Sequence, residues 1–182
     1  MEVVRTSRLA LRDFSLSDLD AVHAYASDPV VTRFTSFGPN TYEQSRGFVE
    51  YCVSNASAVP RSDYTLAVEL LEGRALIGGC GLHNPNHGQW ELGYVLARAY
   101  WAKGFATELV QALTTFAFSR LAAAKVWAPV DAANIASSRV LEKSGFALEG
   151  LLREDRLRWS EGRDTKVYGL LASEWKHPPR AA

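Results

Sequence analysis

The sequence predicts a mixed α/β fold, with one central, mostly antiparallel sheet of about seven strands flanked by about four helices. Three observations lead to this prediction. The length of 182 residues corresponds to one domain, which we expect to span residues 1–182. The composition is 47% hydrophobic and 22% charged, as in a globular protein with a full core. The segments follow the order β-α-α-β-β-β-α-β-α-β-β, so a run of antiparallel strands leads into a β-α-β-α unit.

The first half of the chain is expected to hold one strand, two helices and three further strands. Polar and apolar residues alternate over 7–14, which is typical of a half-buried strand. A helix follows the capping residues at 15–18 and ends before Pro29. A second helix starts at a capping box formed by Thr41 and Gln44. Three β-prone runs separated by turns then complete this half. The expected ranges after the first strand are 18–28, 41–56, 64–70, 75–82 and 89–96.

The second half alternates helices and strands. A long amphipathic helix is expected first, with its apolar residues on one face. A short strand follows, then a helix that is capped by Asn134 and closed by Gly145, and finally two strands. The expected ranges are 104–119, 125–130, 134–143, 146–157 and 166–171.

Charge and cysteine content favour a cytoplasmic protein without a metal. The 20 Lys and Arg residues balance the 20 Asp and Glu residues, so no basic field supports binding to nucleic acid or to a membrane. No apolar stretch is long enough to cross a membrane, and the basic residues near the N-terminus leave no room for a signal-peptide core. Cys52 and Cys80 belong to no disulfide framework or metal cluster, and we expect two reduced, buried thiols.

The loop before the long helix is a candidate binding site for a diphosphate. N–H groups at the start of a helix have no partner within the helix, and they carry the positive end of its dipole. Small residues at Ala102, Gly104 and Ala106 would let an anion approach these groups closely. The alternative is an ordinary turn with a glycine near a helix start. A Walker loop and a dinucleotide-binding fingerprint are both absent from the sequence.

With the segment around Asn134, the chain resembles the GNAT superfamily of acyl-CoA-dependent N-acyltransferases. The likeness is greatest to its Rim-type branch of ribosomal-protein N-terminal acetyltransferases. It covers nearly the whole chain and rests on an opening strand motif, on the strand and loop before the long helix, and on the helix that ends in Lys-Ser-Gly-Phe. These matching segments are Ser7–Arg12, Glu91–Tyr94, Trp101–Ala106, Asn134–Phe146, Asp164 and Tyr168–Leu170.

The resemblance implies acetyl-CoA as co-substrate and a sheet that is splayed in the middle to admit its pantetheine arm. Backbone groups of the splayed strand would pair with pantetheine, and N–H groups of the loop would hold the diphosphate. The implied coenzyme-binding residues are Val95, Leu96, Arg98, Trp101, Ala102, Lys103, Gly104, Phe105, Ala106, Thr107, Asn134 and Ser137. Arg98 and Lys103 have a second interpretation as solvated loop charges, and Arg139 and Lys143 are either phosphate contacts or solvent-facing.

Two positions in the loop depart from the family's usual pattern. Trp101 stands where Arg or Gln is common, although Trp occurs there in the Rim-type branch. Ala102 stands where Gly is frequent, and it can offer its N–H to the coenzyme provided that its φ is negative. On that condition we expect coenzyme binding to survive.

The implied reaction is direct attack of a neutral amine on the acetyl thioester in a ternary complex. Ser137 would assist the departing thiolate, or would serve only as a capping hydroxyl. Glu91 is the first candidate base, unless its side chain points away from the cleft. His83 is the alternative base, unless it is an exposed loop histidine. Tyr94 either supports the substrate or packs in the core.

The most favoured acceptor is the N-terminal α-amine of a protein or peptide. The alternatives are a small-molecule amine, such as an aminoglycoside, a polyamine or an amino acid, and a non-catalytic acyl-CoA-binding sensor. The acceptor wall is expected from residues Thr32 to Ala58 and from His83 to His87. The branch is also compatible with a homodimer.

Overall fold

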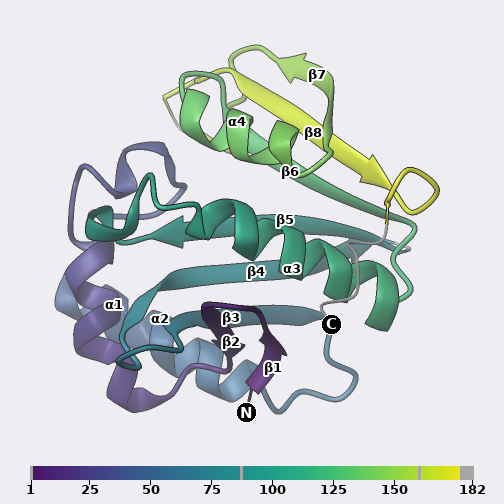
Figure 1. Cartoon of the computed structure of the whole chain (residues 1–182). Coiled ribbons are helices and arrows are strands. Elements are labelled where there is room, and N and C mark those ends of the chain that lie inside the picture. The colour runs from purple at the N-terminus through teal and green to yellow at the C-terminus, as the bar shows by residue number, and fades with distance from the viewer. Residues whose placement is uncertain (1, 87, 160, 177–182) are drawn as a thin grey trace.

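The computed structural model describes residues 2–86, 88–159 and 161–176, which form an eight-stranded sheet with helices on both faces (Figure 1). The strands are β1 (Glu2–Arg5), β2 (Leu9–Arg12), β3 (Asp63–Leu70), β4 (Leu76–Asn86), β5 (Gln89–Leu96), β6 (Lys125–Asp131), β7 (Ala147–Leu152) and β8 (Thr165–Leu171). The α-helices are α1 (Leu19–Ala26), α2 (Tyr42–Asn55), α3 (Phe105–Arg120) and α4 (Ile135–Lys143). The strand order is β1-β2-β3-β4-β5-β6-β8-β7. All neighbouring strands are antiparallel except β5 and β6, so the predicted fold class is confirmed.

Three strands differ from the sequence expectation. The chain begins with an additional strand, β1, which forms a hairpin with β2. β4 extends through Asn86 because it continues to pair with β5 as far as Gln89. β7 ends at Leu152 rather than at Leu157, since the chain adopts a left-handed conformation at Glu154, where φ is +49°.

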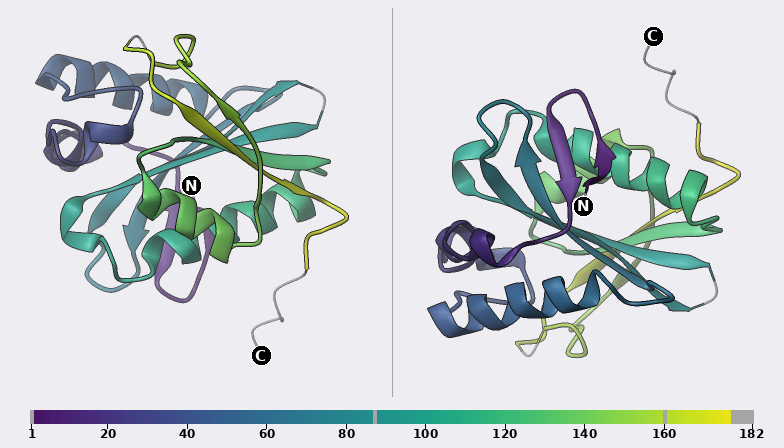
Figure 2. Two further views of the ribbon diagram at one scale, coloured as in Figure 1. Left: turned by 90° about the horizontal axis from the view of Figure 1, so that it is seen from above. Right: turned by 90° about the horizontal axis from the view of Figure 1, so that it is seen from below.

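The four α-helices divide between the two faces of the sheet. α1 and α2 lie on one face, and α3 and α4 lie on the other, as the views from above and below show (Figure 2). Along β5 the side chains alternate between these faces. Leu92 and Leu96 belong to the main core cluster, which also includes Leu109 of α3 and Leu141 of α4, whereas Val95 packs against the cluster beneath α1 and α2.

The centre of the sheet is split between β5 and β6. These parallel strands are in register at only three positions, Gln89–Lys125, Trp90–Val126 and Glu91–Trp127. β6 then continues alongside β8, and β5 continues alongside β4, so residues 92–96 of β5 have no partner strand on the β6 side. The splay expected between these strands is therefore present.

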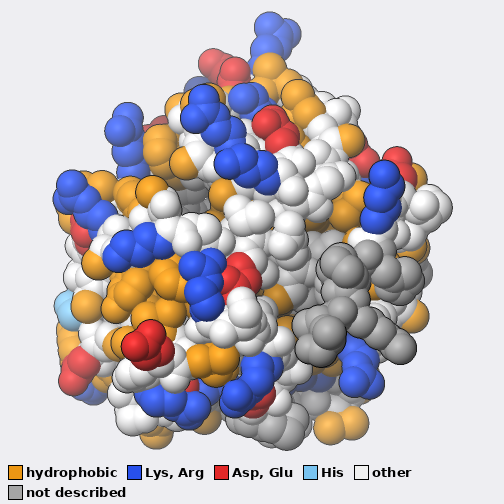
Figure 3. All heavy atoms as spheres, in the orientation of Figure 1, with side chains coloured by type: hydrophobic (Ala, Val, Ile, Leu, Met, Phe, Trp, Pro, Cys, Tyr) orange, Lys and Arg blue, Asp and Glu red, His pale blue; other side chains and the backbone are white. Residues whose placement is uncertain are grey.

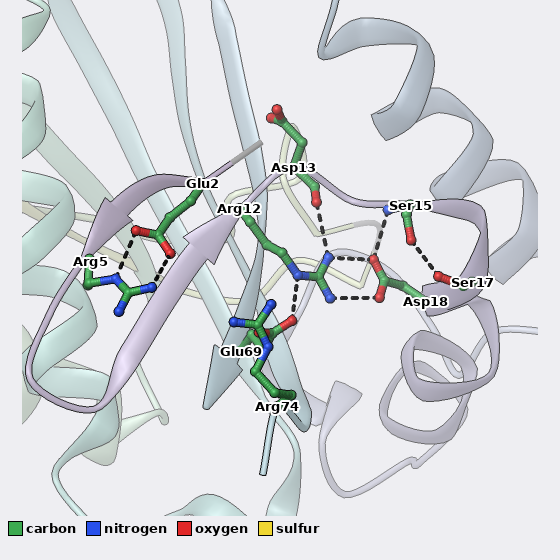
Figure 4. Close-up of polar contacts among 9 residues, drawn as sticks. All are labelled: Glu2, Arg5, Arg12, Asp13, Ser15, Ser17, Asp18, Glu69 and Arg74. Atoms are coloured by element: carbon green, nitrogen blue, oxygen red, sulfur yellow. Dashed lines mark hydrogen bonds and ion pairs between the residues drawn. The ribbon is translucent and has the colours of Figure 1, made fainter. Parts of the chain in front are cut away.

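A buried ionic cluster around Arg12 fixes the connection between β2 and α1 (Figure 4). The Arg12 guanidinium donates to both carboxylate oxygens of Asp18 at 2.8 Å, and its Nε donates to Glu69 of β3 at 2.6 Å. Arg74 pairs with the other oxygen of Glu69 at 2.8 Å. The hydrogen bonds that Arg12 donates to these two carboxylates outweigh the cost of burial and raise its pKa, so Arg12 stays charged. The cluster thus holds α1 against the β3–β4 hairpin.

The described helices include none that is long and apolar enough to cross a membrane. Cys52 and Cys80 are both buried and free, as expected. Burial raises the pKa of the Cys52 thiol to about 12 and raises the pKa of Cys80 as well.

Candidate active site

The loop between β5 and α3 presents its backbone to solvent. Residues 101–104 are all exposed. The first helical bond of α3 runs from the Glu108 N–H to the Gly104 carbonyl at 3.1 Å, so the preceding N–H groups have no partner within the helix. Gly104 caps α3 with a φ of +81°, a conformation that L-amino acids rarely adopt. Open N–H groups on a loop of small residues can hold an anion such as a diphosphate.

Ala102 does not have the negative φ on which its predicted role in coenzyme binding depended. Its φ is +58°, in the left-handed region, and not negative. Glycine would adopt this conformation with little strain, whereas the Cβ of alanine adds to its cost. The loop therefore has the shape that a glycine would allow, and the alanine bears the strain.

Arg8 braces this loop from the N-terminal hairpin. Its Nη1 donates to the Lys103 carbonyl at 3.0 Å, its Nε donates to Glu108 at 2.6 Å, and its guanidinium lies 4.4 Å above the centre of the Phe105 ring. Glu108 also accepts hydrogen bonds from Thr6 and Ser7. Burial would raise the pKa of Glu108, but these bonds outweigh it and lower the pKa, so the brace stays charged.

Basic side chains gather over α4 and over the N-terminal end of α3 on one face of the molecule (Figure 3). Arg98 and Lys103 in the loop are exposed, as are Arg139 and Lys143 on α4. In the part of the chain that the structure describes, none of these four forms a salt bridge. The Lys103 ammonium lies 5.7 Å from the centre of the Tyr100 ring. A chain with no net charge thus presents a basic surface on the coenzyme side of the predicted site.

Backbone direction along the split corrects one expectation. The Ala97 N–H donates to the Ile77 carbonyl of β4 at 2.8 Å. Because backbone groups alternate along an antiparallel strand, those of Val95 also face β4, while those of Leu96 face the split. The Val95 carbonyl indeed lies against Gly78 of β4. Val95 was therefore wrongly expected to offer its backbone to pantetheine, and Leu96 remains a candidate.

Trp101 lies beside the open end of the split. Its indole Nε1 donates to the Leu96 carbonyl at 2.7 Å, which ties the loop to the end of β5. The side chain is 43% exposed. The large residue at this loop position thus forms one edge of the entrance to the split.

The start of α4 places a hydroxyl pair beside β5. Asn134 caps the helix by accepting the Ser137 N–H at 3.1 Å, as predicted. The Ser137 hydroxyl instead lies 3.1 Å from the Tyr94 hydroxyl, across the split. Burial raises the pKa of Tyr94, and the hydrogen bond with Ser137 lowers it by less, so the phenol stays protonated and can donate. The structure thus adds Tyr94 to the residues that the sequence placed near a thioester.

Glu91 and His83 lie on the face of the sheet that carries α1 and α2, opposite to the face of Tyr94 and Ser137. They are directly paired across β4 and β5. Glu91 forms an ion pair with Arg158 at 2.8 Å. His83 lies within β4 and not in a loop, and its Nδ1 is 3.0 Å from Asp63 of β3. Both candidate bases therefore lie on the face of the sheet opposite to α3 and α4.

The expected acceptor wall is tied to the second half of the chain by Arg163. Its Nη1 donates to the Arg33 carbonyl at 2.7 Å and to Asp131 at the end of β6 at 3.2 Å. Arg33 lies in a short 3₁₀ helix, Thr32–Phe34, within the predicted wall. In the other predicted segment, residue 87 lies outside the described residues.

Comparison with known proteins identifies the family. The family model described as "Acetyltransferase (GNAT) domain" matches residues 8–147, which is well over half of the chain. The chain belongs to the GNAT acetyltransferase family. This GNAT chain is 33% identical over 178 residues to an uncharacterised N-acetyltransferase, p20, from Bacillus licheniformis, and the match covers 96% of this chain and 99% of p20.

Solved structures share the fold of this GNAT domain. A GNAT-family acetyltransferase from Bacillus anthracis superposes with a TM-score of 0.84 at 28% identity, covering 94% of this chain and 99% of that one. Two more distant structures are similar in fold alone. One is RimL, a ribosomal L7/L12 α-N-protein acetyltransferase in complex with coenzyme A, with a TM-score of 0.80 at 18% identity and coverage of 94% and 98%. The other is spermidine N-acetyltransferase from Vibrio cholerae with CoA and spermine, with a TM-score of 0.79 at 23% identity and coverage of 93% and 98%.

Three residues in this arrangement were not found as site residues from the sequence, and each acts through a distant partner. They are Arg8, Asp63 and Arg158. The opening strand motif included Arg8, and Tyr94 was offered as a substrate support or a core residue, but neither signal named the partner. Pairs separated by 20 to 100 residues carry no local signature in one sequence.

Proposed function

We propose that this acetyltransferase transfers the acetyl group of acetyl-CoA to the N-terminal α-amine of a protein or peptide, by direct attack in a ternary complex. One observation carries the proposal, namely the split that opens beyond Glu91 and Trp127 next to the exposed N–H groups before α3. We extend the proposal to one acetyltransferase domain over residues 1–182 and to a cytoplasmic location, which the buried free thiols support.

The residues around the split fit a coenzyme with a diphosphate and an extended arm. N–H groups of residues 103–107 would hold the diphosphate, with Arg98 and Lys103 as charged partners. The Trp101 N–H, which was also expected to take part, already donates to the Arg98 carbonyl at 3.2 Å, and Ala102 has a positive φ. The backbone of Leu96 would pair with the pantetheine arm as an added strand would. The coenzyme supplies an acetyl thioester, and its thiol end would lie near the Tyr94–Ser137 pair and the Asn134 cap.

An α-amine suits the acceptor side for two reasons. With a pKa of about 7.7–8.0, an α-amine needs only about 1 kcal/mol to lose its proton at pH 7, whereas a lysine side chain with a pKa of about 10.4 needs roughly 4–5 kcal/mol. Three carboxylates near the split are also already paired, Asp63 with His83, Glu91 with Arg158 and Asp131 with Arg163. Within the described residues, this leaves no cluster of free acids to attract a polycation.

A small amine is the second candidate, because an open cavity of about 430 Å³ adjoins Arg158, the ion-pair partner of Glu91. Its lining includes the apolar residues Trp127, Pro129 and Val167 from β6 and β8, together with Asp155. One carboxylate beside an apolar wall would suit a monoamine better than a polyamine.

Mass spectrometry of the products tests the proposal. The protein is incubated with acetyl-CoA and a panel of short peptides with free or blocked α-amines, lysine side chains and small amines. We expect acetylation of free α-amines and none of the blocked peptides. Acetylation of small amines alone would overturn the acceptor class. Coenzyme binding in calorimetry without any product would indicate a sensor and overturn the proposed activity.

A further inference from the structure

We propose that His83 accepts the proton of the acceptor amine, that Asp63 is its positioning residue, and that Glu91 anchors Arg158 instead of acting as the base. This inference rests on the proposed function and decides between the two candidate bases. Its support comes from three features of the sheet face beneath α1 and α2.

The first feature is the fixed orientation of the His83 ring. Its Nδ1 lies 3.0 Å from Oδ2 of Asp63, and Asp63 is itself held by the Thr65 hydroxyl at 2.6 Å and by the Tyr51 hydroxyl at 3.3 Å. A carboxylate that accepts the Nδ1 proton leaves Nε2 as the basic nitrogen, because the ring then carries its single proton on Nδ1. The arrangement thus sets the tautomer as well as the direction of the ring.

The second feature is the open surface under the free nitrogen. The His83 ring lies over Gly81, where an added Cβ would come within 2.8 Å of Nε2. Gly81 pairs with Gly93 of β5, and a Cβ built on Gly93 would meet no atom within 4 Å. One step further along the strands, Gly79 is covered by Tyr25 of α1. Gly81 is buried beneath the His83 ring, whereas Gly93 is exposed and uncovered, so a recess over Gly93 lies beside the ring.

This recess lies next to the opening of the split. β5 and β6 part immediately after Glu91, and Gly93 is two residues further along β5. The coenzyme side of the split, with Tyr94 and Ser137, is on the other face of the same strand. An amine in the recess would thus reach a thioester in the split from the face opposite to α3 and α4.

The third feature is that Glu91 is already engaged. Its carboxylate accepts a hydrogen bond from the Arg158 guanidinium at 2.8 Å, and both side chains are mostly buried. The guanidinium occupies Oε1 of this carboxylate, so an incoming amine would have to compete with the ion pair for Glu91. Glu91 therefore suits the role of anchoring the β7–β8 loop.

The titratable and charged groups described near His83 come from β3, β5, α2 and the segment between β7 and β8. Asp63 on β3 and Glu91 on β5 are both carboxylates, Tyr51 of α2 reaches Asp63, and Arg158 neutralises Glu91. The hydrogen bond to Asp63 is the main reason why the pKa of His83 is raised, and it outweighs the opposing effect of burial. This raised pKa lies closer to the pKa of an α-amine, which favours proton transfer from the amine to the imidazole.

The protons balance as follows. The bound ammonium gives one proton to Nε2 of His83, and His83 releases it to solvent. The neutral amine nitrogen then forms a bond to the acetyl carbon as the C–S bond breaks, and the sulfur keeps the electron pair. The second nitrogen proton leaves as the amide forms, and the sulfur ends as a thiol. The net products are an N-acetyl amide, a free thiol and one proton.

The test compares the pH dependence of kcat in matched variants, with a short peptide carrying a free α-amine as the probe. Ionisation of the peptide contributes equally to every variant, so differences between variants report the enzyme. His83→Gln should lower kcat by roughly 10²-fold or more. It should also remove the acid limb of the pH profile, that is, the fall in kcat at low pH that protonation of the enzyme causes. Glu91→Gln should keep that limb. His23→Gln is the control, since His23 contacts Ser45 between α1 and α2 and lies outside the site.

Asp63→Asn distinguishes positioning from a merely structural role. Loss of the carboxylate lowers the pKa of His83, so His83 stays neutral to lower pH and the acid limb moves to lower pH, while kcat at the plateau falls by roughly tenfold or more. In the protein without coenzyme, NMR titration of the His83 ring protons should show the same downward shift. A limb and a ring pKa that stay in place would overturn the role of Asp63.

The remaining outcomes separate this inference from the proposed function. Suppose that the wild-type protein acetylates peptides. If His83→Gln is then fully active, or if only Glu91→Gln loses the acidic fall in kcat, the inference is overturned and the proposed function stands. Absence of transfer by the wild-type protein to every amine in the panel would overturn both.

Discussion

Ala102 holds a backbone conformation that suits glycine better than alanine. Its φ of +58° lies in the loop whose N–H groups we propose to hold the diphosphate. Strain of this kind at a single residue is typical of binding sites, where the surrounding structure enforces an unfavourable conformation. The neighbouring Arg8 brace, with bonds to Lys103 and Glu108, supplies that enforcement here.

Replacing Ala102 with glycine should therefore stabilise the protein. Ala102→Gly removes the left-handed strain, and we expect a gain of about 0.5–1 kcal/mol in the free energy of unfolding, after the entropy of the unfolded glycine is included. Acetyl-CoA affinity should be retained or increased. Thermal denaturation and titration calorimetry measure the two effects.

Ala122, just beyond α3, provides the matched control because its φ is +51°. Ala122→Gly should give a similar gain in stability without a change in coenzyme affinity. A loss of stability in Ala102→Gly would contradict the strain argument.

Tyr94 and Ser137 form the second residue-scale feature with a testable role. Ser137→Ala should lower kcat by roughly ten- to a hundredfold with little change in acetyl-CoA affinity, because a thiolate leaving group needs only modest help from a proton donor. Tyr94→Phe should lower kcat to a smaller extent, since it removes only the bond that orients Ser137. Stopped-flow or steady-state thiol release measures both rates.

Ser144→Ala is the control at the other end of the same helix, because the Ser144 hydroxyl donates to the Val140 carbonyl. A wild-type rate in Ser137→Ala would reassign the Ser137 hydroxyl to a structural role.

Among the elements, the loop and the first turn of α3 act as one unit. Gly104 enters the helix with a φ of +81°, and the exposed N–H groups on either side depend on that turn. The loop leads into α3, which packs in the main core, so the end of the loop that joins the helix is held in place. A change at Gly104 should therefore alter the loop and leave the helix in place.

Gly104→Val should abolish measurable acetyl-CoA binding while the protein remains folded. A β-branched residue is strongly disfavoured at this φ of +81°, so valine would force the turn into another conformation. Titration calorimetry and circular dichroism together measure this outcome. Gly73→Val is the matched control, as Gly73 has a φ of +73° in the turn between β3 and β4. If both variants bound the coenzyme like the wild type, the diphosphate site would lie elsewhere.

Elements that depend on local signals were predictable from the sequence, and contacts between distant segments were not. The capping box of Thr41 and Gln44 and the Asn134 cap are both present, because a cap involves residues three positions apart. Along β5, Glu91 and Trp90 lie on opposite faces, as the alternation of side chains along any strand requires. The extension of β4 past Leu82 was missed, since it depends on pairing with β5 and not on the residues of β4.

The candidate site follows the same division. The N–H groups of the loop and the split could be expected from the residues that carry the family resemblance. The left-handed φ of Ala102, the direction of the Val95 carbonyl and the pairing of His83 with Asp63 could not, because each depends on how the sheet closes around the split.

Across the whole molecule, the split divides the sheet into β1–β5 and β6–β8. Besides the three pairs between β5 and β6, two arginines link the halves on the acceptor side. Arg158 reaches Glu91, and Arg163 reaches the Arg33 carbonyl while also pairing with Asp131. These links hold the walls of the recess at a fixed separation.

Arg163→Ala should weaken acceptor binding more than coenzyme binding. Loss of its hydrogen bond to the wall removes about 1 kcal/mol, so KM for the acceptor peptide should rise about fivefold while KM for acetyl-CoA stays constant. Initial-rate kinetics with each substrate varied in turn measure the two constants. Arg74→Ala removes another arginine paired with a carboxylate, in the hairpin turn, and should change neither. Equal increases in both KM values would mean that Arg163 stabilises the whole domain.

The two cysteines have a practical consequence for all of these measurements. Their thiols are buried in the described structure and hard to ionise, so both should resist reagents that consume thiolates. A colorimetric assay with an aromatic disulfide would then register the liberated coenzyme against a flat protein baseline, and turnover of the native enzyme could be followed continuously without blocking or mutating either position.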